Sequence, residues 1–214
     1  MEEEQFSLAA LGSLCLIFQV AASISPASIM SNRWILQAAF LLGFLSITLS
    51  INYEELERTQ RSSNSACLKL LDQLERRSCL GHRDYFKFPM EVKHPGQMEK
   101  KDAAFIIKVM FENIFIVFKN NSSSTGWNES IVREFLGKLH TQIDKLRKIL
   151  KEVPENERRT SSNYPTIRHL KSYYGRVRRF LEVKEFSSCA WMVVQAEILR
   201  NFSILIRLTN IFQN

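Results

Sequence analysis

The sequence predicts an all-α protein, and three observations support this fold class. From Ile51 onward, apolar residues recur at intervals of three and four, as on one face of a helix. No stretch alternates apolar and polar residues between turn signals, as half-buried strands do. Polar segments containing Gly, Pro, Ser or Asn separate the periodic stretches. We therefore expect five helices in one bundle, with one long crossover segment between the first two.

Residues 1–50 have a different character, with three acids, one base and many apolar residues. Residues 30–50 (MSNRWILQAAFLLGFLSITLS) combine Arg33, an apolar stretch and small residues at 48 and 50, which predicts a signal peptide cut before Ile51. Residues 1–29 follow an acidic start, MEEE, and we interpret them as an upstream extension outside the fold. The alternative is two transmembrane helices of about 17 to 20 residues each.

The predicted folded domain, residues 51–214, is strongly basic. The chain has 29 Lys and Arg and 22 Asp and Glu, of which residues 1–50 hold one and three, leaving 28 bases and 19 acids. Such a charge favours acidic partners, whether receptor surfaces, sulfated glycans or nucleic acid.

The first two predicted helices cover residues 52–74 and, beginning at an Asp102 N-cap, residues 102–118. The second is apolar most of the way round and should be the most buried. Their apolar stripes are Cys67, Leu70, Leu71 and Leu74, then Ile106, Val109, Met110 and Val117 with Ile107, Phe111, Ile114 and Phe118.

Three further helices follow a turn at residues 120–130 and a break at Pro154. The fourth begins near Pro165, which suits a first-turn position, and contains Gly175, which predicts close packing or a bend. The fifth begins after Ser187 and Ser188. Their core stripes are Val132, Leu136, Leu139, Ile143, Leu146 and Leu150; Ile167, Leu170, Tyr174, Val177 and Leu181; and Trp191, Val194, Ile198, Phe202 and Leu205.

The residues required for catalysis or metal binding do not come together in the sequence. No nucleophile-elbow, zinc-protease, P-loop or dinucleotide-binding motif occurs, and no two cysteines have C-x-x-C spacing. We predict no enzyme activity, no metal and no cofactor. The histidines are scattered singly, at His82, His94, His140 and His169.

The segment HLKSYYGRVRRF, residues 169–180, mixes bases with aromatic residues, as nucleic-acid-binding segments do. On a helix, however, its tyrosines face inward and its bases lie on the solvated side. We therefore expect no nucleic-acid requirement, with weak contact to sulfated glycans or RNA as the alternative.

Four N-x-S/T sequons occur, at Asn120, Asn121, Asn128 and Asn201. Asn128 lies beside the predicted turn and is the best candidate for a glycan. Asn120 and Asn121 are adjacent, so we do not expect both to be modified.

Three cysteines remain after signal cleavage, and three pairings are open. Cys67 lies on a buried stripe, where a free thiol behaves as a small apolar residue. We favour a Cys79–Cys189 disulfide, which closes a loop of more than one hundred residues and contributes about 4–5 kcal/mol in the chain-entropy model. Three unpaired thiols, the alternative, would require a reducing compartment.

The side of the last helix away from its core stripe carries a mixed set of residues: Ala196, Leu199, Arg200, Ser203 and Arg207. Small, apolar and arginine side chains together are typical of a protein-binding surface. The alternative is a solvated face with one tolerated leucine.

Several blocks of the sequence resemble the type I interferons, and most of all their beta branch. SSCAWMVVQAEILRNF resembles the signature of their last helix, SSSTGWNES and HLKSYYGRV their turn and fourth helix, and RSSNSACLKLLDQL their first helix. The resemblance covers nearly all of residues 30–214, including the leader RWILQAAFLL.

The resemblance implies a secreted five-helix cytokine with up-up-down-down topology and long crossover loops. It implies binding to a two-chain cell-surface receptor, antiviral and antiproliferative signalling, no catalytic site and no membrane insertion after signal cleavage. The family's disulfide joins the first crossover to the start of the last helix, which agrees with Cys79–Cys189.

The resemblance also implies which residues contact the receptor. Arg83, in the C-L-x-x-R segment of the crossover, and the last helix would bind one receptor chain. Lys171 on the fourth helix would bind the other. The matched positions on the last helix are Ala196, Leu199 and Arg200.

Two positions depart from the family pattern. Gln195 stands where the family usually has arginine, so we expect this receptor contact to be weakened. A glycan on Asn201 would obstruct the neighbouring Arg200, so we expect Asn201 to be unmodified or the binding surface to be displaced.

Overall fold

The computed structural model describes residues 52–74, 86–96, 98–119, 126–151 and 164–213, which belong to one compact unit. All secondary structure in these residues is helical, which confirms the predicted fold class. The long helices are α3 (Tyr53–Gln73), α5 (Lys100–Lys119), α6 (Glu129–Lys151), α8 (Tyr164–Val183) and α9 (Ser188–Asn210), and the short ones α4 (Met90–Lys93) and η3 (Ile211–Gln213).

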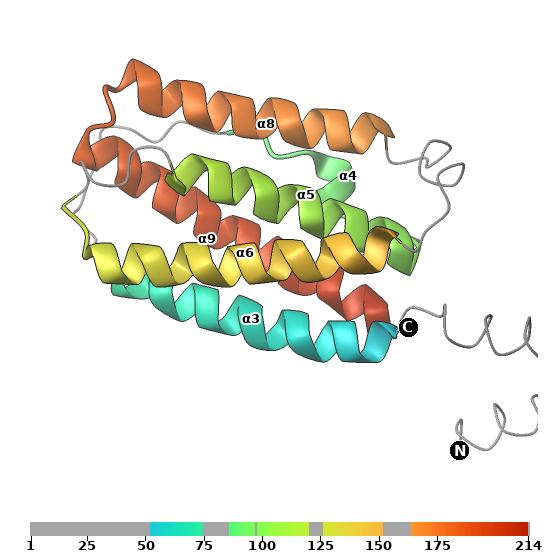
Figure 1. Ribbon diagram of the computed structural model, residues 1–214. Helices are drawn as coiled ribbons and strands as arrows, with labels where there is room; N and C mark the ends of the chain where they lie inside the picture. The colour runs from blue at the N-terminus through green and yellow to red at the C-terminus, as the bar shows by residue number, and fades with distance from the viewer. Residues whose placement is uncertain (1–51, 75–85, 97, 120–125, 152–163, 214) are drawn as a thin grey trace, which may run out of the picture. The chain divides into compact units, whose positions relative to one another are not determined.

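The helices form an up-up-down-down bundle with α8 as an added fifth member (Figure 1). α3 and α5 run in the same direction, and α6 and α9 run in the opposite direction. α5 lies between α8 and α6 in this view, α3 lies on the other side of α6, and α9 lies behind. α9 packs against α3, α5 and α8, so the side of this last helix that faces these three helices is buried in the bundle.

The helix starts are stabilised by polar side chains. Asn52 caps α3 by accepting a 2.9 Å hydrogen bond from the Glu55 amide. The α5 prediction was wrong in detail, because Asp102 is not an N-cap. The helix begins two residues earlier, and Asp102 lies buried in its first turn. The Glu99 carbonyl accepts from the Ala103 amide at 3.0 Å and so starts the helical hydrogen bonds before Asp102.

The core confirms the predicted apolar stripes except at Leu136 on α6 and Ile167 on α8, which are only half-buried. Both stripes of α5 are buried, because α6 and α8 cover one part of its surface and α9 another. On α6, Phe135 is buried and Leu136 only half-buried, since the aromatic ring turns towards Phe118 at 5.1 Å between centroids. Phe118 also packs against Trp127 and Trp191, at 6.0 and 5.7 Å.

Gly175 does not mark close packing, contrary to the prediction. A Cβ built on this residue would meet no atom within 4 Å, and α8 continues through it as a regular helix. The position therefore requires no glycine for reasons of space.

The turn from α8 to α9 is short and uses two left-handed residues, Glu185 (φ 51°) and Phe186 (φ 52°). Neither is a glycine, so each adopts a conformation that L-residues disfavour. The Phe186 amide donates to the Leu181 carbonyl at 2.8 Å, and the Ser187 hydroxyl caps α9. These bonds hold the start of α9 against the end of α8.

Candidate functional site

The outer side of α9 carries the mixed residue set predicted from the sequence. Ala196, Arg200, Ser203 and Arg207 are exposed, and Leu199 is half-buried with its side chain packed against the core. We call these five residues the α9 face. A partly supported leucine beside an exposed arginine suits a protein contact.

Arg200 is held in place by a buried network between α8 and α9. Its guanidinium lies 3.0 Å from the Glu197 carboxylate, whose side chain is only 7% exposed. The hydroxyl of buried Tyr173 donates to the same carboxylate at 2.8 Å. Burial, with the nearby Tyr174 and Glu197, raises the pKa of Tyr173, so this hydroxyl keeps its proton. The network therefore fixes an exposed positive charge on a rigid support.

Asn201 belongs to this network and is fully buried. Its amide nitrogen donates to the Tyr173 hydroxyl and to the Glu197 carbonyl, both at 2.9 Å, and its oxygen accepts from Tyr174 at 2.6 Å. With both amide hydrogens in use, the side chain has no room for a glycan. This burial agrees with the expectation that Asn201 is unmodified.

The assignment of Gln195 as a receptor contact is wrong, because the side chain is buried. Its exposure is 2%, and its amide donates to the carbonyls of Leu71 and Leu74 at 2.7 and 3.4 Å. These carbonyls lie at the C-terminal end of α3, where the last carbonyls have no i+4 amide to accept from. Gln195 thus joins α9 to α3 and faces away from the α9 face.

The end of the crossover segment, residues 86–88, packs against α8. Phe86 packs edge-on against Phe180 at 5.3 Å, and Phe88 against Tyr173 at 4.9 Å. Arg176 donates to the backbone carbonyl of Lys87 at 2.8 Å. The crossover therefore reaches the same tyrosine that positions Arg200 through Glu197.

A second polar contact joins α4 to α8. The imidazole Nδ1 of His169 lies 2.6 Å from the Glu91 carboxylate. Partial burial raises the pKa of Glu91, but the hydrogen bond and charge of His169, with a backbone hydrogen bond, outweigh it and leave the pKa lowered. The Glu91 carboxylate is thus stabilised in its charged form.

The structure places the cysteines as follows. Cys189, at the start of α9, is disulfide-bonded, and Cys67 is a buried free thiol. Burial raises the pKa of the Cys67 thiol to about 12, which makes it unreactive at neutral pH. Cys79 lies outside the described residues, so its pairing with Cys189 stays a prediction. Arg83, Asn120 and Asn121 also lie outside them.

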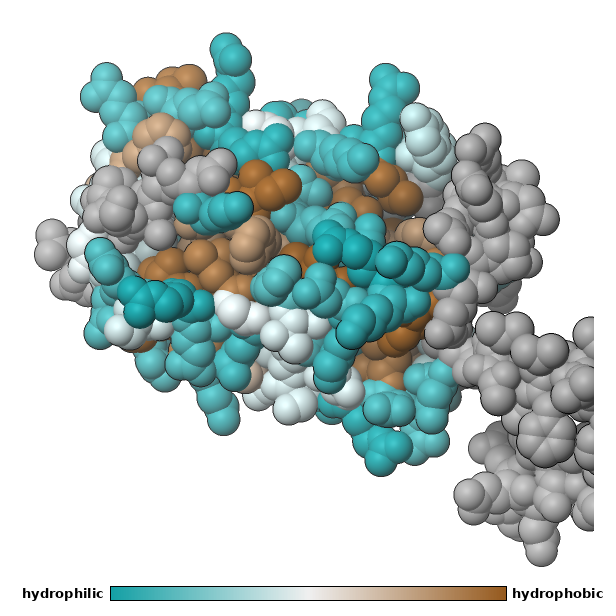
Figure 2. Space-filling view, in the orientation of Figure 1, coloured by the Kyte–Doolittle hydropathy of each residue, from teal (hydrophilic) through white to brown (hydrophobic). Residues whose placement is uncertain are grey.

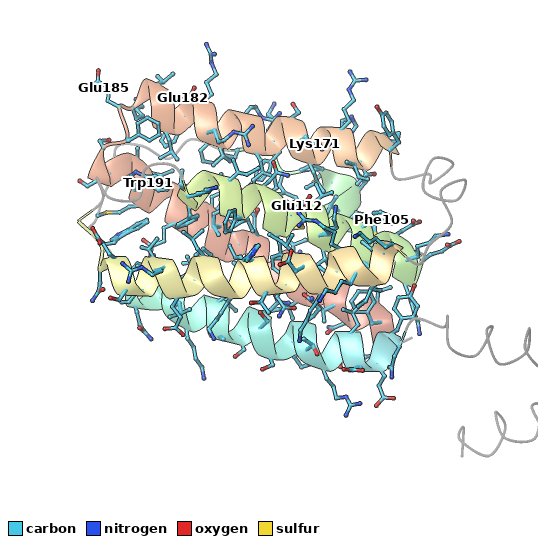
Figure 3. The ribbon with its side chains drawn as sticks, in the orientation of Figure 1. Phe105, Glu112, Lys171, Glu182, Glu185 and Trp191 are labelled. Carbon is cyan, nitrogen blue, oxygen red and sulfur yellow. The ribbon has the colours of Figure 1, made fainter. Side chains whose placement is uncertain are left out.

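Lys171 lies on α8, the helix that packs against both α5 and α9. Its side chain is exposed on α8, above α5, where Phe105 and Glu112 point to the same side (Figure 3). We call these three residues the α5–α8 face. Hydrophilic residues surround apolar patches on the side of the molecule shown in Figure 2. Arg147 of α6 forms a salt bridge with Glu112 at 3.0 Å, and this contact joins α6 to α5 beside the α5–α8 face.

The described residues offer no group of three His, Cys, Asp or Glu side chains that could hold a metal. The segment Ser188–Gln213 is long and apolar enough to cross a membrane, but it is the core helix of the bundle and 56% of its most apolar window is buried. Its apolar composition is explained by packing inside the protein.

Sequence reasoning missed Tyr173 and Glu197, the residues that position Arg200. Tyr173 is adjacent to Tyr174 and lies off the predicted stripe, and Glu197 lies between the core residues of α9. A glutamate directly before the core residue Ile198 and one turn after Val194 was the available signal, because a buried carboxylate requires a partner.

Comparison with known proteins agrees with this geometry. A model of the interferon alpha/beta domain matches residues 56–212. The chain belongs to the interferon alpha/beta family. It is therefore an interferon, a cytokine of innate immunity and not an enzyme, as the sequence predicted.

The relatives support the beta branch of the interferon family. Interferon beta of Mus musculus is 50% identical over 185 residues, which cover 86% of this chain and the whole of the relative. Interferon beta of Homo sapiens is 46% identical over 187 residues, with the same coverage. Interferon beta-2 of Bos taurus is 40% identical over 182 residues, 84% of this chain and 97% of the relative.

Solved interferon structures share the fold. Zebrafish interferon 1 superposes with a TM-score of 0.61 at 15% identity, covering 71% of this chain and 95% of that structure. Zebrafish interferon 2 gives 0.60 at 24% identity, covering 69% and 97%. At these identities the likeness concerns the helical fold alone.

Proposed function

We propose that this interferon is secreted and acts by bridging two receptor chains on the cell surface, so that antiviral and antiproliferative signalling begins. One observation carries the proposal: one packed bundle presents two separate surfaces, the α9 face on the helix drawn behind the others and the α5–α8 face on the helices drawn in front of it (Figures 1 and 3). A rigid body with two separate contact surfaces holds two partners at a fixed separation.

The α9 face has the chemistry expected of the tighter contact. Arg200 is exposed but positioned by Glu197, so less side-chain freedom is lost on binding than for an unsupported arginine. Leu199 and Ala196 supply apolar area beside it. Buried apolar and arginine side chains dominate the energetics of most protein interfaces.

We place Arg83 in the same contact, through the crossover. Residues 86–93 are fastened to α8, and Cys189 is disulfide-bonded at the start of α9. A Cys79–Cys189 bridge would bring the C-L-x-x-R segment beside α9. Lys171 and its neighbours then serve the second receptor chain.

Asn128 is the proposed glycosylation site of the described residues. It is exposed, and its Oδ1 accepts from the Ser130 amide at 2.9 Å at the start of α6. A glycan is attached through Nδ2, so the modification preserves this helix cap. Asn120 and Asn121 stay secondary candidates.

The N-terminal region completes the proposal. We assign residues 30–50 as the signal peptide, residues 1–29 as an upstream extension and residues 51–214 as the cytokine domain. This organisation delivers the protein outside the cell, where a receptor can be reached.

Truncation of the α9 face tests the proposal. We expect Leu199→Ala and Arg83→Ala each to weaken binding to the receptor by more than about 1 kcal/mol, because each removes part of a central contact. Surface plasmon resonance with the receptor ectodomains measures the change, and circular dichroism checks that helix content is retained.

Ile149→Ala is the matched control for the leucine variant. Ile149 is also half-buried, but it lies on α6 outside both faces, so its truncation should leave receptor affinity unchanged. Wild-type affinity for both Leu199→Ala and Arg83→Ala would overturn the placement of the contact.

A further inference from the structure

A polar groove runs between α3 and α6, on neither of the two proposed receptor faces. It encloses about 800 Å³ and opens to solvent. Small residues, Ala66 on α3 and Gly137 on α6, leave the space between the helices unfilled. The remaining lining residues are Arg58, Thr59, Ser62, Ser63, Glu134, Lys138, Thr141, Gln142 and Lys145.

The side chains that line the groove carry a net positive charge, which favours an anionic ligand. Both helices contribute bases, Arg58 from α3 and Lys138 and Lys145 from α6, against one lining acid, Glu134. The two lysines are seven residues apart, so they lie about two helical turns, or 10 Å, along the groove. The hydroxyl groups of Thr59 and Ser62 on α3 can donate further hydrogen bonds to an anionic ligand.

The existing ion pairs of these bases do not block such a ligand. Arg58 lies 3.4 Å from Glu54, and Lys138 lies 3.6 Å from Glu134. Glu54 and Glu134 are more than half exposed, so each pair is weak and easily exchanged for a multivalent anion. Oxyanions with several oxygens accept from arginine and lysine together more strongly than a single carboxylate does.

We propose that this groove binds a sulfated polysaccharide chain. Nucleic acid fits less well, because the residues lining the groove include no aromatic side chain on which a base could stack. Bases about 10 Å apart along an open groove instead suit sulfate groups repeated along a sugar chain. Binding here would concentrate the interferon at the cell surface while leaving both receptor faces accessible.

Calorimetric titration with a sulfated heparin oligosaccharide at 0.15 M salt, about physiological ionic strength, tests the site. We expect the double variant Lys138→Gln/Lys145→Gln to bind roughly tenfold more weakly and with a shallower salt dependence. The matched control, Arg168→Gln/Arg179→Gln on α8, changes the net charge equally and should retain wild-type affinity. Lys145→Glu, at an exposed position, provides a second groove variant should the double variant fold poorly.

Several outcomes would overturn the site: wild-type affinity in both groove variants, a larger loss in the α8 control, equal binding of desulfated oligosaccharide, or tighter binding of single-stranded RNA. Signalling on receptor-bearing cells separates this inference from the proposed function. On cells stripped of sulfated glycans, the groove variants should reach half-maximal signalling at the same concentration as wild type, whereas Leu199→Ala should require a higher concentration.

Discussion

At the scale of single residues, burial decides which side chains are accessible to a partner. Gln195 and Ala196 are neighbours in the sequence, yet one bonds the end of α3 and the other faces solvent. Apolar periodicity predicted the exposure of Ala196. It could not predict the burial of Gln195, because its partners, the carbonyls of Leu71 and Leu74, lie more than 120 residues away in the sequence.

The sequons provide a prediction at this scale. Ser130→Ala, which destroys the Asn128 sequon, should lower the mass of the protein expressed in mammalian cells by one N-glycan. Ser203→Ala, which destroys the Asn201 sequon, should leave the glycan mass unchanged because Asn201 is enclosed between Tyr173 and Tyr174. Intact-protein mass spectrometry before and after enzymatic deglycosylation measures both. A glycan lost with Ser203→Ala would contradict the buried network in secreted material.

At the scale of elements, local sequence patterns predict the helices. They do not predict the contacts between the helices. The 3-4 spacing predicted the five long helices and most of their core residues. The α4 turn was not predicted, since its four residues are too short to show a period. The prediction that Asp102 caps α5 was wrong. The first hydrogen bond of this helix is accepted by the backbone carbonyl of Glu99, and the capping rules identify side chains and not such a carbonyl. Contacts such as that of Phe88 with Tyr173 join segments that are far apart in the sequence, and no local periodicity indicates that they meet.

Gly175 gives a prediction for α8. Gly175→Ala should stabilise the protein by about 0.5–1 kcal/mol, because alanine loses less backbone entropy in a helix and no atom stands within 4 Å of the added Cβ. Urea denaturation followed by circular dichroism measures the change. Gly126→Ala is the contrasting control, since Gly126 has φ of 76° and the substitution there should destabilise. Destabilisation by Gly175→Ala would show that the helix requires the glycine.

The joint between α4 and α8 gives a pH prediction. The pKa of Glu91 is lowered in the folded state, so its contact with His169 adds stability above the carboxyl's ordinary pKa of 4.5 and loses it as the pH falls below that value. Glu91→Gln should therefore be less stable than wild type at pH 6, and the difference should shrink towards pH 3.

Thermal denaturation across this pH range measures the effect of Glu91→Gln. Glu182→Gln, an exposed change on α8 with the same loss of charge, serves as the control. Equal stability of wild type and Glu91→Gln at pH 6 would show that the α4 contact contributes nothing.

At the scale of the whole molecule, α3 and α5 run in the same direction, so the chain between them must cross the length of the bundle. The end of this crossover packs against α8. The bundle then has three distinct surfaces: the α9 face, the α5–α8 face and the polar groove between α3 and α6. The sequence predicted the first from periodicity and resemblance. The groove could not be predicted, because its basic residues come from segments some 80 residues apart that only the fold brings together.

The aromatic cluster gives this molecule an internal optical reporter. Trp127 and Trp191 are buried, with ring centroids 5.7 Å apart, where α5, α6 and α9 meet. Indole emission from such an apolar setting is shifted to the blue and moves to the red once water enters. Fluorescence therefore distinguishes a substitution that damages the interior from one that alters recognition alone.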